Sequence, residues 1–181
     1  MKKHRKSEIV QIVLFLAFAV FLFFAIPRFV AERIIVEGDS MEATIFHNDN
    51  ILVEKVSRYF GAIDRYDVIV FFPNEEAKKN GTRYYVKRVI GLPGETVQIK
   101  YGTVYINGKP IPEEYGSSPM DNAGIAGEPL VLGEDEYFVL GDNRFVSEDS
   151  RSERLGPVPA ERIGGRVIFR LFPLKRIGRI D

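Results

Sequence analysis

The chain has 181 residues, of which 45% are hydrophobic and 28% are charged, and its formal net charge is zero. This composition is typical of a globular domain with a core and excludes a disordered chain. The balanced charge gives no indication of nucleic acid as a partner. The absence of cysteine excludes disulfides, a thiolate nucleophile and a zinc–thiolate site.

One long apolar segment lies near the N-terminus. From Ile9 to Ile26 the only strongly polar residue is Gln11, and a helix of that length covers about 27 Å, close to the roughly 30 Å of a hydrocarbon core. A cleaved signal peptide has a shorter apolar segment followed by small residues, whereas Pro27-Arg-Phe-Val30 follow here. We therefore predict an uncleaved transmembrane anchor over residues 9–30.

The charges that flank the anchor predict its orientation. Lys2, Lys3, Arg5 and Lys6 precede it, and the positive-inside rule assigns such a cluster to the cytoplasm. Residues 1–8 are then a basic cytoplasmic tail, and residues 31–181 form an extracytoplasmic domain at the cell membrane. The basic C-terminal segment 166–179 is a possible contact with anionic lipid, or a solvated charged face.

The remaining sequence predicts many short β-strands and no convincing helix. Alternating or continuous apolar segments bounded by turn residues predict strands at 33–36, 51–56, 66–72, 83–90, 96–100, 103–106, 137–140 and 165–172. We expect residues 74–81 to form a charged loop, and residues 109–134 to form a surface excursion or small cap. The predicted fold is mainly β, an antiparallel sandwich or barrel-like catalytic domain behind one transmembrane helix.

A candidate nucleophile lies a few residues after the anchor. Ser40 occupies the centre of Val36-Glu-Gly-Asp-Ser-Met-Glu-Ala-Thr44, and a serine hydroxyl needs a base. His4 precedes the membrane segment, so His47 is the sole candidate histidine. The other candidate is a neutral lysine, which must be desolvated to act near neutral pH.

Lys87 is the best candidate for such a lysine. It lies in an apolar strand, on the same face as Tyr85 and Val89, where burial would disfavour its charged form. Its neighbour Arg88 points to the other face and stays protonated. Alternation does not say which face is buried, and the alternative is an exposed strand lysine.

A third block, residues 141–151, is unusually rich in charge for a turn. Within it, Ser147 can hydrogen-bond a lysine amine, and acids can pair with arginines to stiffen the loop. The candidate ion-pairing residues are Asp142, Asp149, Arg144 and Arg151. The alternative is a solvated polar loop with ion pairs of little energetic value.

These blocks together resemble the bacterial type I signal peptidases, and in particular the compact members typical of Gram-positive bacteria. They follow an N-terminal anchor in the order of that family, and the resemblance spans residues 9 to 172. The matching segments are Gly38-Asp-Ser-Met41 with Thr44, Tyr66-Asp-Val-Ile-Val-Phe71, Tyr85-Val-Lys-Arg-Val-Ile-Gly-Leu-Pro-Gly94, Gly141-Asp-Asn-Arg144 and Ser147-Glu-Asp-Ser-Arg151.

The resemblance implies a role for each block. Ser40 is the expected nucleophile, Lys87 the general base, and Ser147 the residue that orients the lysine. The backbone N–H of Ser40 is an expected oxyanion donor. Four further residues are expected to brace the site, namely Asp142, Arg144, Asp149 and Arg151.

Two positions depart from the family pattern. Some members carry a serine at the position of Gly38, where its hydroxyl is a second oxyanion donor, so the second donor from the Gly38 region is open here. Ala43 stands where the family usually has a proline before the threonine, which predicts a less rigid turn.

The implied activity is that of a membrane-bound serine endopeptidase that removes N-terminal signal peptides from exported preproteins. Its expected partners are those signal peptides, the lipid bilayer and, as a further candidate, the secretion translocon. No cofactor, metal or nucleic acid is expected. The alternatives are a catalytically inactive, membrane-tethered binding module of the same fold, a self-cleaving Ser–Lys repressor, which needs a DNA-binding domain, and a Ser–His enzyme built on His47.

Overall fold

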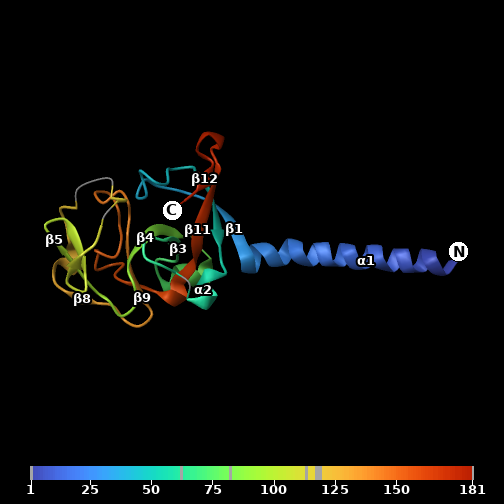
Figure 1. The fold of residues 1–181 in the computed structure, drawn as a ribbon, viewed down its shortest axis with the longest axis horizontal. Coiled ribbons are helices and arrows are strands. Elements are labelled where there is room, and N and C mark those ends of the chain that lie inside the picture. The colour runs from blue at the N-terminus through green and yellow to red at the C-terminus, as the bar shows by residue number, and fades with distance from the viewer. Residues whose placement is uncertain (1, 62, 82, 113, 117–119, 181) are drawn as a thin grey trace.

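The computed structural model describes residues 2–61, 63–81, 83–112, 114–116 and 120–180. A helix, α1 (Lys2–Ala25), projects alone from a β domain and ends in a π-helical turn, η1 (Ile26–Val30) (Figure 1). The 21-residue segment Val10–Val30 is long and apolar enough to cross a membrane, and none of it is buried against the β domain.

The β domain contains two antiparallel sheets. The larger has the strand order β1-β2-β11-β3-β4-β9-β10, with β12 paired to β11. Its strands are β1 (Ala31–Ile35), β2 (Asn50–Glu54), β3 (Val68–Phe71), β4 (Tyr85–Gly91), β9 (Glu136–Leu140), β10 (Val158–Pro159), β11 (Ile163–Phe172) and β12 (Gly178–Arg179). The prediction of a mainly antiparallel β domain of sandwich- or barrel-like architecture behind an apolar helix is confirmed.

The centre of the larger sheet is buried on both faces. In the central strand β3, Val68 and Val70 pack into one hydrophobic cluster, while Ile69 and Phe71 pack into another on the opposite face. A strand that is covered on both sides needs apolar residues at every position. This explains the continuous apolar segment in the sequence, and it makes the middle of the sheet a rigid base for the neighbouring strand β4.

The smaller sheet has the order β7-β6-β5-β8 and lies on the side of the domain that is remote from α1 (Figure 1). The turn between β5 and β6 contains Tyr101 and Gly102 at φ of 50° and 77°, as a two-residue hairpin turn requires. The strands and the helical turn beside them are β5 (Thr96–Lys100), β6 (Thr103–Ile106), β7 (Lys109–Pro110), β8 (Leu130–Val131) and η2 (Gly124–Gly127).

Residues 109–134 therefore supply parts of the smaller sheet. They provide β7, β8 and η2, and their Met120, Ala126 and Leu132 are buried in a cluster with residues of β5, β6 and β9. Positions 113 and 117–119 of this predicted excursion lie outside the described residues.

The expectation of a loop at 74–81 is wrong, because a short helix, α3 (Glu75–Asn80), occupies it. The side chain of Asn74 accepts a hydrogen bond from the Ala77 N–H at 2.7 Å, and Gly81 ends the helix at φ 61°. These are standard helix start and stop signals. Four further short helical segments of the described chain were not predicted, namely α2 (Ser57–Phe60), η2, η3 (Ala160–Arg162) and η4 (Leu174–Arg176).

Candidate active site

Ser40 lies in the loop that joins β1 to β2. The base of this loop is closed by the backbone of Val36, which donates to the Asp49 carbonyl and accepts from the Asn48 N–H, both at 2.9 Å. Inside the loop, Met41 and Ile45 are 2% and 0% exposed. Their burial on either side of a tight turn holds Ser40 at the surface of the core.

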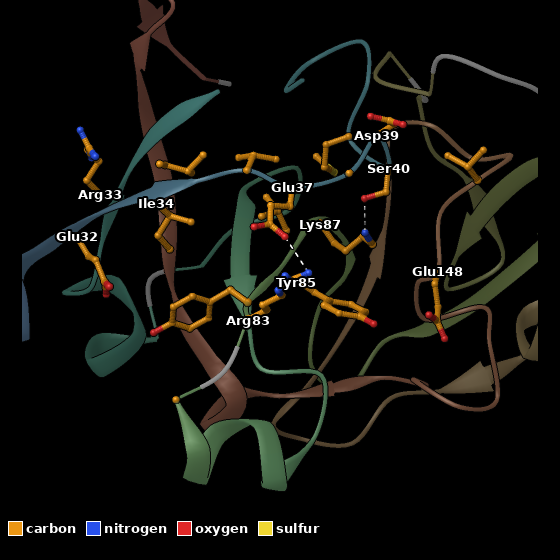
Figure 2. Close-up of a pocket in the computed structure, with 18 residues that line it drawn as sticks. Glu32, Arg33, Ile34, Glu37, Asp39, Ser40, Arg83, Tyr85, Lys87 and Glu148 are labelled. Atoms are coloured by element: carbon orange, nitrogen blue, oxygen red, sulfur yellow. Dashed lines mark hydrogen bonds and ion pairs between the residues drawn. The ribbon is translucent and has the colours of Figure 1, made fainter. Parts of the chain in front are cut away.

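Lys87 reaches Ser40 from β4. The strand register places it opposite Ile69 in the buried centre of the sheet, and the residue is only 3% exposed. Its Nζ atom lies 2.6 Å from the Oγ of Ser40, as Figure 2 shows. Tyr85, which the alternation placed on the same face, has its ring centre 5.7 Å from that nitrogen.

Burial sets the protonation of this amine. Desolvation lowers the pKa of Lys87 from 10.5 to about 8, although the carboxylates of Asp149, Glu148 and Asp142 raise it in part. No carboxylate forms an ion pair with Lys87 among the described residues. A neutral amine in hydrogen-bond contact with a serine hydroxyl is chemically able to accept its proton.

Arg88 faces the opposite side of β4 and is fully buried. Its Nε and Nη2 atoms donate to the two carboxylate oxygens of Asp142 at 2.9 and 2.8 Å. The Thr44 hydroxyl donates to Asp142 at 2.5 Å, and the Tyr115 ring lies 3.7 Å from the guanidinium. This cluster ties the Ser40 loop, β4 and the 141–151 segment together.

The 141–151 segment is organised by a second buried pair. Asp149 is 1% exposed, and its carboxylate accepts from Arg151 Nε at 2.8 Å and Nη2 at 2.9 Å. It also accepts from the Gly141 N–H at 3.1 Å. Arg144 is buried and donates from Nε to the Gly141 carbonyl at 3.0 Å. The predicted bracing residues thus lie in one region of the structure, where Asp142 forms an ion pair with Arg88 and Asp149 forms one with Arg151.

Gly141 allows this segment to approach the nucleophile closely. A Cβ atom at Gly141 would lie 2.4 Å from the Ser40 carbonyl oxygen and 2.2 Å from the Ser147 Oγ. The Asn143 N–H donates to that same Ser40 carbonyl at 3.1 Å. The Ser147 hydroxyl is buried and has no hydrogen-bond partner among the described residues. The structure therefore brings Ser147 beside Ser40 without a hydrogen bond to Lys87.

The predicted oxyanion region lies at the start of the Ser40 turn. Within the described chain, the Ser40 N–H has no acceptor, whereas the Gly38 N–H donates to Nδ1 of His47 at 3.1 Å. Gly38 has φ of 95°, a conformation that side-chain-bearing residues rarely adopt. His47 contacts Gly38 in this way, and it makes no hydrogen bond to Ser40.

A groove of about 660 Å³ leads to the pair. One wall is β1 and its continuation through Glu37 to Ser40, and the other is the segment from Arg83 to Lys87. β1 is an end strand of the sheet, so its outer edge is unpaired in the described residues. The exposed side chains of Glu37 and Arg83 form a 2.8 Å ion pair between the two walls (Figure 2).

Sequence reasoning missed several residues that hold the site. The sequence analysis excludes Arg88 as a base and gives it no other role, although a charged residue in an apolar strand is typical of a buried ion pair. Tyr115, Asn122 and Met120 contact Arg88, Arg151 and Arg144, and no local pattern marks them. Among the described residues no group of three or more His, Cys, Asp or Glu side chains is arranged to hold a metal.

Residues 9–172 match the family model described as signal peptidase, peptidase S26. The chain is 40% identical over 177 residues to a signal peptidase I of Leptolyngbya laminosa, covering 96% of this chain and 85% of that protein. It is 37% identical over 185 residues to a signal peptidase I of Bacillus licheniformis, covering 98% and 96%. A crystal structure of a signal peptidase I from Enterococcus faecalis V583 shares 34% identity, with a TM-score of 0.44 over 57% of this chain and 94% of that one.

Proposed function

This chain belongs to the signal peptidase family, peptidase S26, and we propose that it removes signal peptides from exported preproteins with Ser40 as nucleophile and Lys87 as general base. The observation that carries the assignment of residues is the 2.6 Å contact between the Ser40 Oγ and the buried Nζ of Lys87. Nothing in the comparisons favours an inactive relative, and the chain carries the serine and the lysine that the chemistry needs.

The reaction starts from the neutral form of Lys87. Its amine takes the proton of the Ser40 hydroxyl while the Oγ attacks the scissile carbonyl carbon. Collapse of the tetrahedral intermediate breaks the C–N bond, and the lysine ammonium gives its proton to the leaving amine. The signal peptide is then an ester on Ser40. Water, activated by the same amine, hydrolyses that ester and restores the hydroxyl.

The Ser40 N–H is the proposed first oxyanion donor. It has no acceptor among the described residues, so it is available to the developing negative charge. Each such donor commonly contributes about 3 kcal/mol to transition-state stabilisation. Since the Gly38 N–H is engaged by His47 and glycine has no hydroxyl, the second donor comes from water or from movement of the Gly38 region.

Ser147 and the buried ion pairs have supporting roles in this proposal. The Ser147 hydroxyl, which lacks a partner in the described chain, turns toward Lys87 to orient the amine. The Arg88–Asp142 and Arg151–Asp149 pairs fix the loops that carry the reacting groups. Their bidentate geometry and burial suit a positioning role, because a small displacement of reacting atoms is costly to rate.

The substrate binds as an extended chain in the groove. The edge of β1 that is unpaired in the described chain supplies backbone hydrogen bonds to the substrate. The groove walls determine which substrate side chains fit. α1 is the proposed anchor, with its basic N-terminus in the cytoplasm and the β domain outside. Anchoring in the same bilayer as the signal peptide raises the effective concentration of the cleavage site. The secretion translocon is the source from which the preprotein reaches the groove.

The test is cleavage of a purified preprotein by the full-length protein in liposomes. Wild type and the His47→Ala variant are expected to release a product that begins just after the signal peptide. Ser40→Ala and Lys87→Ala are expected to release none, with circular dichroism spectra like that of the wild type. Loss of activity in His47→Ala together with activity in Lys87→Ala would instead assign the base to the histidine.

A further inference from the structure

A second cavity lies where the membrane segment joins the β domain. It has a volume of about 470 Å³ and is lined by residues of α1, η1, β1 and α2 and by residues adjacent to β2, β3 and β4. We call it the junction pocket. The catalytic proposal uses none of its cations, which are Arg28, Lys55 and Arg58.

The backbone brings these three cations together. η1 runs directly into β1, and β1 pairs with β2, so that the Lys55 N–H donates to the Val30 carbonyl at 2.8 Å. α2 follows at once and carries Arg58. The charged pocket is thus fixed to the end of the membrane segment by regular strand pairing.

The charge of the junction pocket is not balanced. Its one carboxylate, Glu32, pairs with Lys55 at 2.6 Å. Arg28 and Arg58 form no ion pair in the described part of the chain. Arg58 donates from Nη1 to the Gly164 carbonyl at 3.2 Å and from Nη2 to the Tyr59 hydroxyl. Its Nε is buried and has no partner among the described residues. Three cations against one carboxylate leave an excess positive charge that suits an anion.

The rest of the lining is aromatic and reaches into the membrane segment. Phe24 and Phe29 lie within Val10–Val30 and are 69% and 55% exposed. Phe72 and Tyr84 also line the pocket, with ring centres 4.5 Å apart and ring planes tilted by 38°. A free phosphate ion needs no such apolar surface, whereas a phospholipid presents a phosphate and acyl chains side by side at this depth.

We propose that the junction pocket binds one anionic phospholipid, whose phosphate lies among Arg28, Lys55 and Arg58 and whose acyl chains lie on Phe24 and Phe29. Guanidinium groups are well suited to phosphate oxygens. Glu32 and Tyr84 line both this pocket and the groove that leads to Ser40. A bound lipid therefore contacts residues of the groove wall and holds the anchor against it. The proposal rests on the membrane anchor of the proposed function, but it is independent of the Ser/Lys chemistry.

The chain contains no tryptophan, which allows a fluorescence test with Phe24→Trp as the only tryptophan. The full-length protein is placed in phosphatidylcholine nanodiscs that contain a small fraction of brominated phosphatidylglycerol or, separately, brominated phosphatidylcholine. We expect brominated phosphatidylglycerol to reach half-maximal quenching at a mole fraction at least about fivefold lower than brominated phosphatidylcholine does. A factor of about five corresponds to the attraction between one cation and an anionic lipid. Inorganic phosphate should not reverse the quenching.

Charge-removing variants distinguish binding of the lipid in the junction pocket from a general attraction of anionic lipid to basic residues on the protein surface. Arg28→Gln and Arg58→Gln are each expected to reduce the preference for phosphatidylglycerol over phosphatidylcholine, and the double variant is expected to abolish it. Arg28 is exposed, so its replacement should not affect folding. Lys175→Gln removes an exposed charge from η4, outside the pocket, and should leave the preference unchanged.

Equal quenching by both lipids, or an unchanged preference in the double variant, overturns the lipid site alone. Reversal by inorganic phosphate at constant ionic strength assigns the site to free anions and overturns it as well. Absence of quenching by either lipid overturns the membrane anchor together with the lipid site.

Discussion

Lys87 and Arg88 are adjacent and both buried, yet only Arg88 is in contact with a carboxylate. Asp142 lies 2.8 Å from the Arg88 guanidinium, while Lys87 faces Ser40 on the other side of β4 with no ion-pair partner in the described chain. The alternation of a β-strand separates the two cations. One is therefore held charged as a structural group, and the other is left to lose its proton.

The pH dependence of cleavage should follow Lys87. Since the protonated amine cannot accept the Ser40 proton, kcat/KM should rise with pH, pass half of its maximum near pH 8 and then level off, in accord with the pKa of about 8. Initial rates between pH 6 and 10 at constant ionic strength measure this. The Glu148→Gln variant removes a carboxylate that raises the Lys87 pKa, so its curve should shift to lower pH. A profile that is flat from pH 6 to 9 would contradict a lysine base.

Replacing Lys87 by methionine should change how stability depends on pH. The folded-state pKa is depressed to about 8 from 10.5, so the unfolded state binds more protons between these values, and wild-type stability rises with pH across that window. The stability advantage of Lys87→Met over wild type should therefore fall by about 3 kcal/mol between pH 7 and pH 11. Urea unfolding at both pH values measures this. A constant difference would show that Lys87 titrates normally.

The Asp142→Asn variant should be strongly destabilised. It leaves the buried guanidinium of Arg88 without its carboxylate, and breaking a buried pair from one side typically costs about 3–5 kcal/mol. Chemical denaturation of the full-length protein in detergent measures the change. Arg154→Gln breaks the exposed pair with Glu148 and should leave the unfolding midpoint unchanged. A small effect at Asp142 would mean that the Arg88 charge is compensated in another way.

Gly141→Ala should impair catalysis. The new methyl group would lie 2.4 Å from the Ser40 carbonyl oxygen, so the nucleophile loop or the 141–151 segment must move. A displacement of about 1 Å can cost about a hundredfold in rate, and kcat should fall by that order while the substrate remains able to bind. Gly178→Ala, where a Cβ meets nothing within 4 Å, is the matched control. Wild-type kcat in Gly141→Ala would show that the contact is not needed.

The sequence predicts the strands of four or more residues and the candidate pair Ser40 and Lys87, because these depend on local signals. The alternation through β4 assigned Lys87 to the face of Tyr85 and Val89, and Tyr85 does lie against the amine in the structure. The continuous apolar segment of residues 66–72 is typical of a strand with little solvent exposure, and all four residues of β3 are buried. The roles of Ser40, Lys87 and the bracing residues came from the resemblance and stay predictions until they are tested by mutation.

The parts that were missed depend on distant contacts or on short segments. The sequence does not predict which arginines pair with Asp142 and Asp149, because the 141–151 segment alone does not reveal that Arg88 contacts Asp142. The helix α3 contains only six residues, too short for a hydrophobic period, although Asn74 and Gly81 were readable as its caps. Tyr115 contacts Arg88 from a region without any periodicity.

The joint between η1 and β1 contains no linker. Val30 is the last residue of the apolar segment that is long enough to cross a membrane, and Ala31 is the first residue of a paired strand. Ser40 follows five residues after Ile35. With α1 in a bilayer, the paired strand β1 therefore fixes the distance of Ser40 from the membrane surface. A substrate can then be cleaved only if the number of residues between its apolar segment and its scissile bond lets that bond reach Ser40. A preprotein with suitable side chains at a cleavage site that lies too near to or too far from the membrane would not be cleaved.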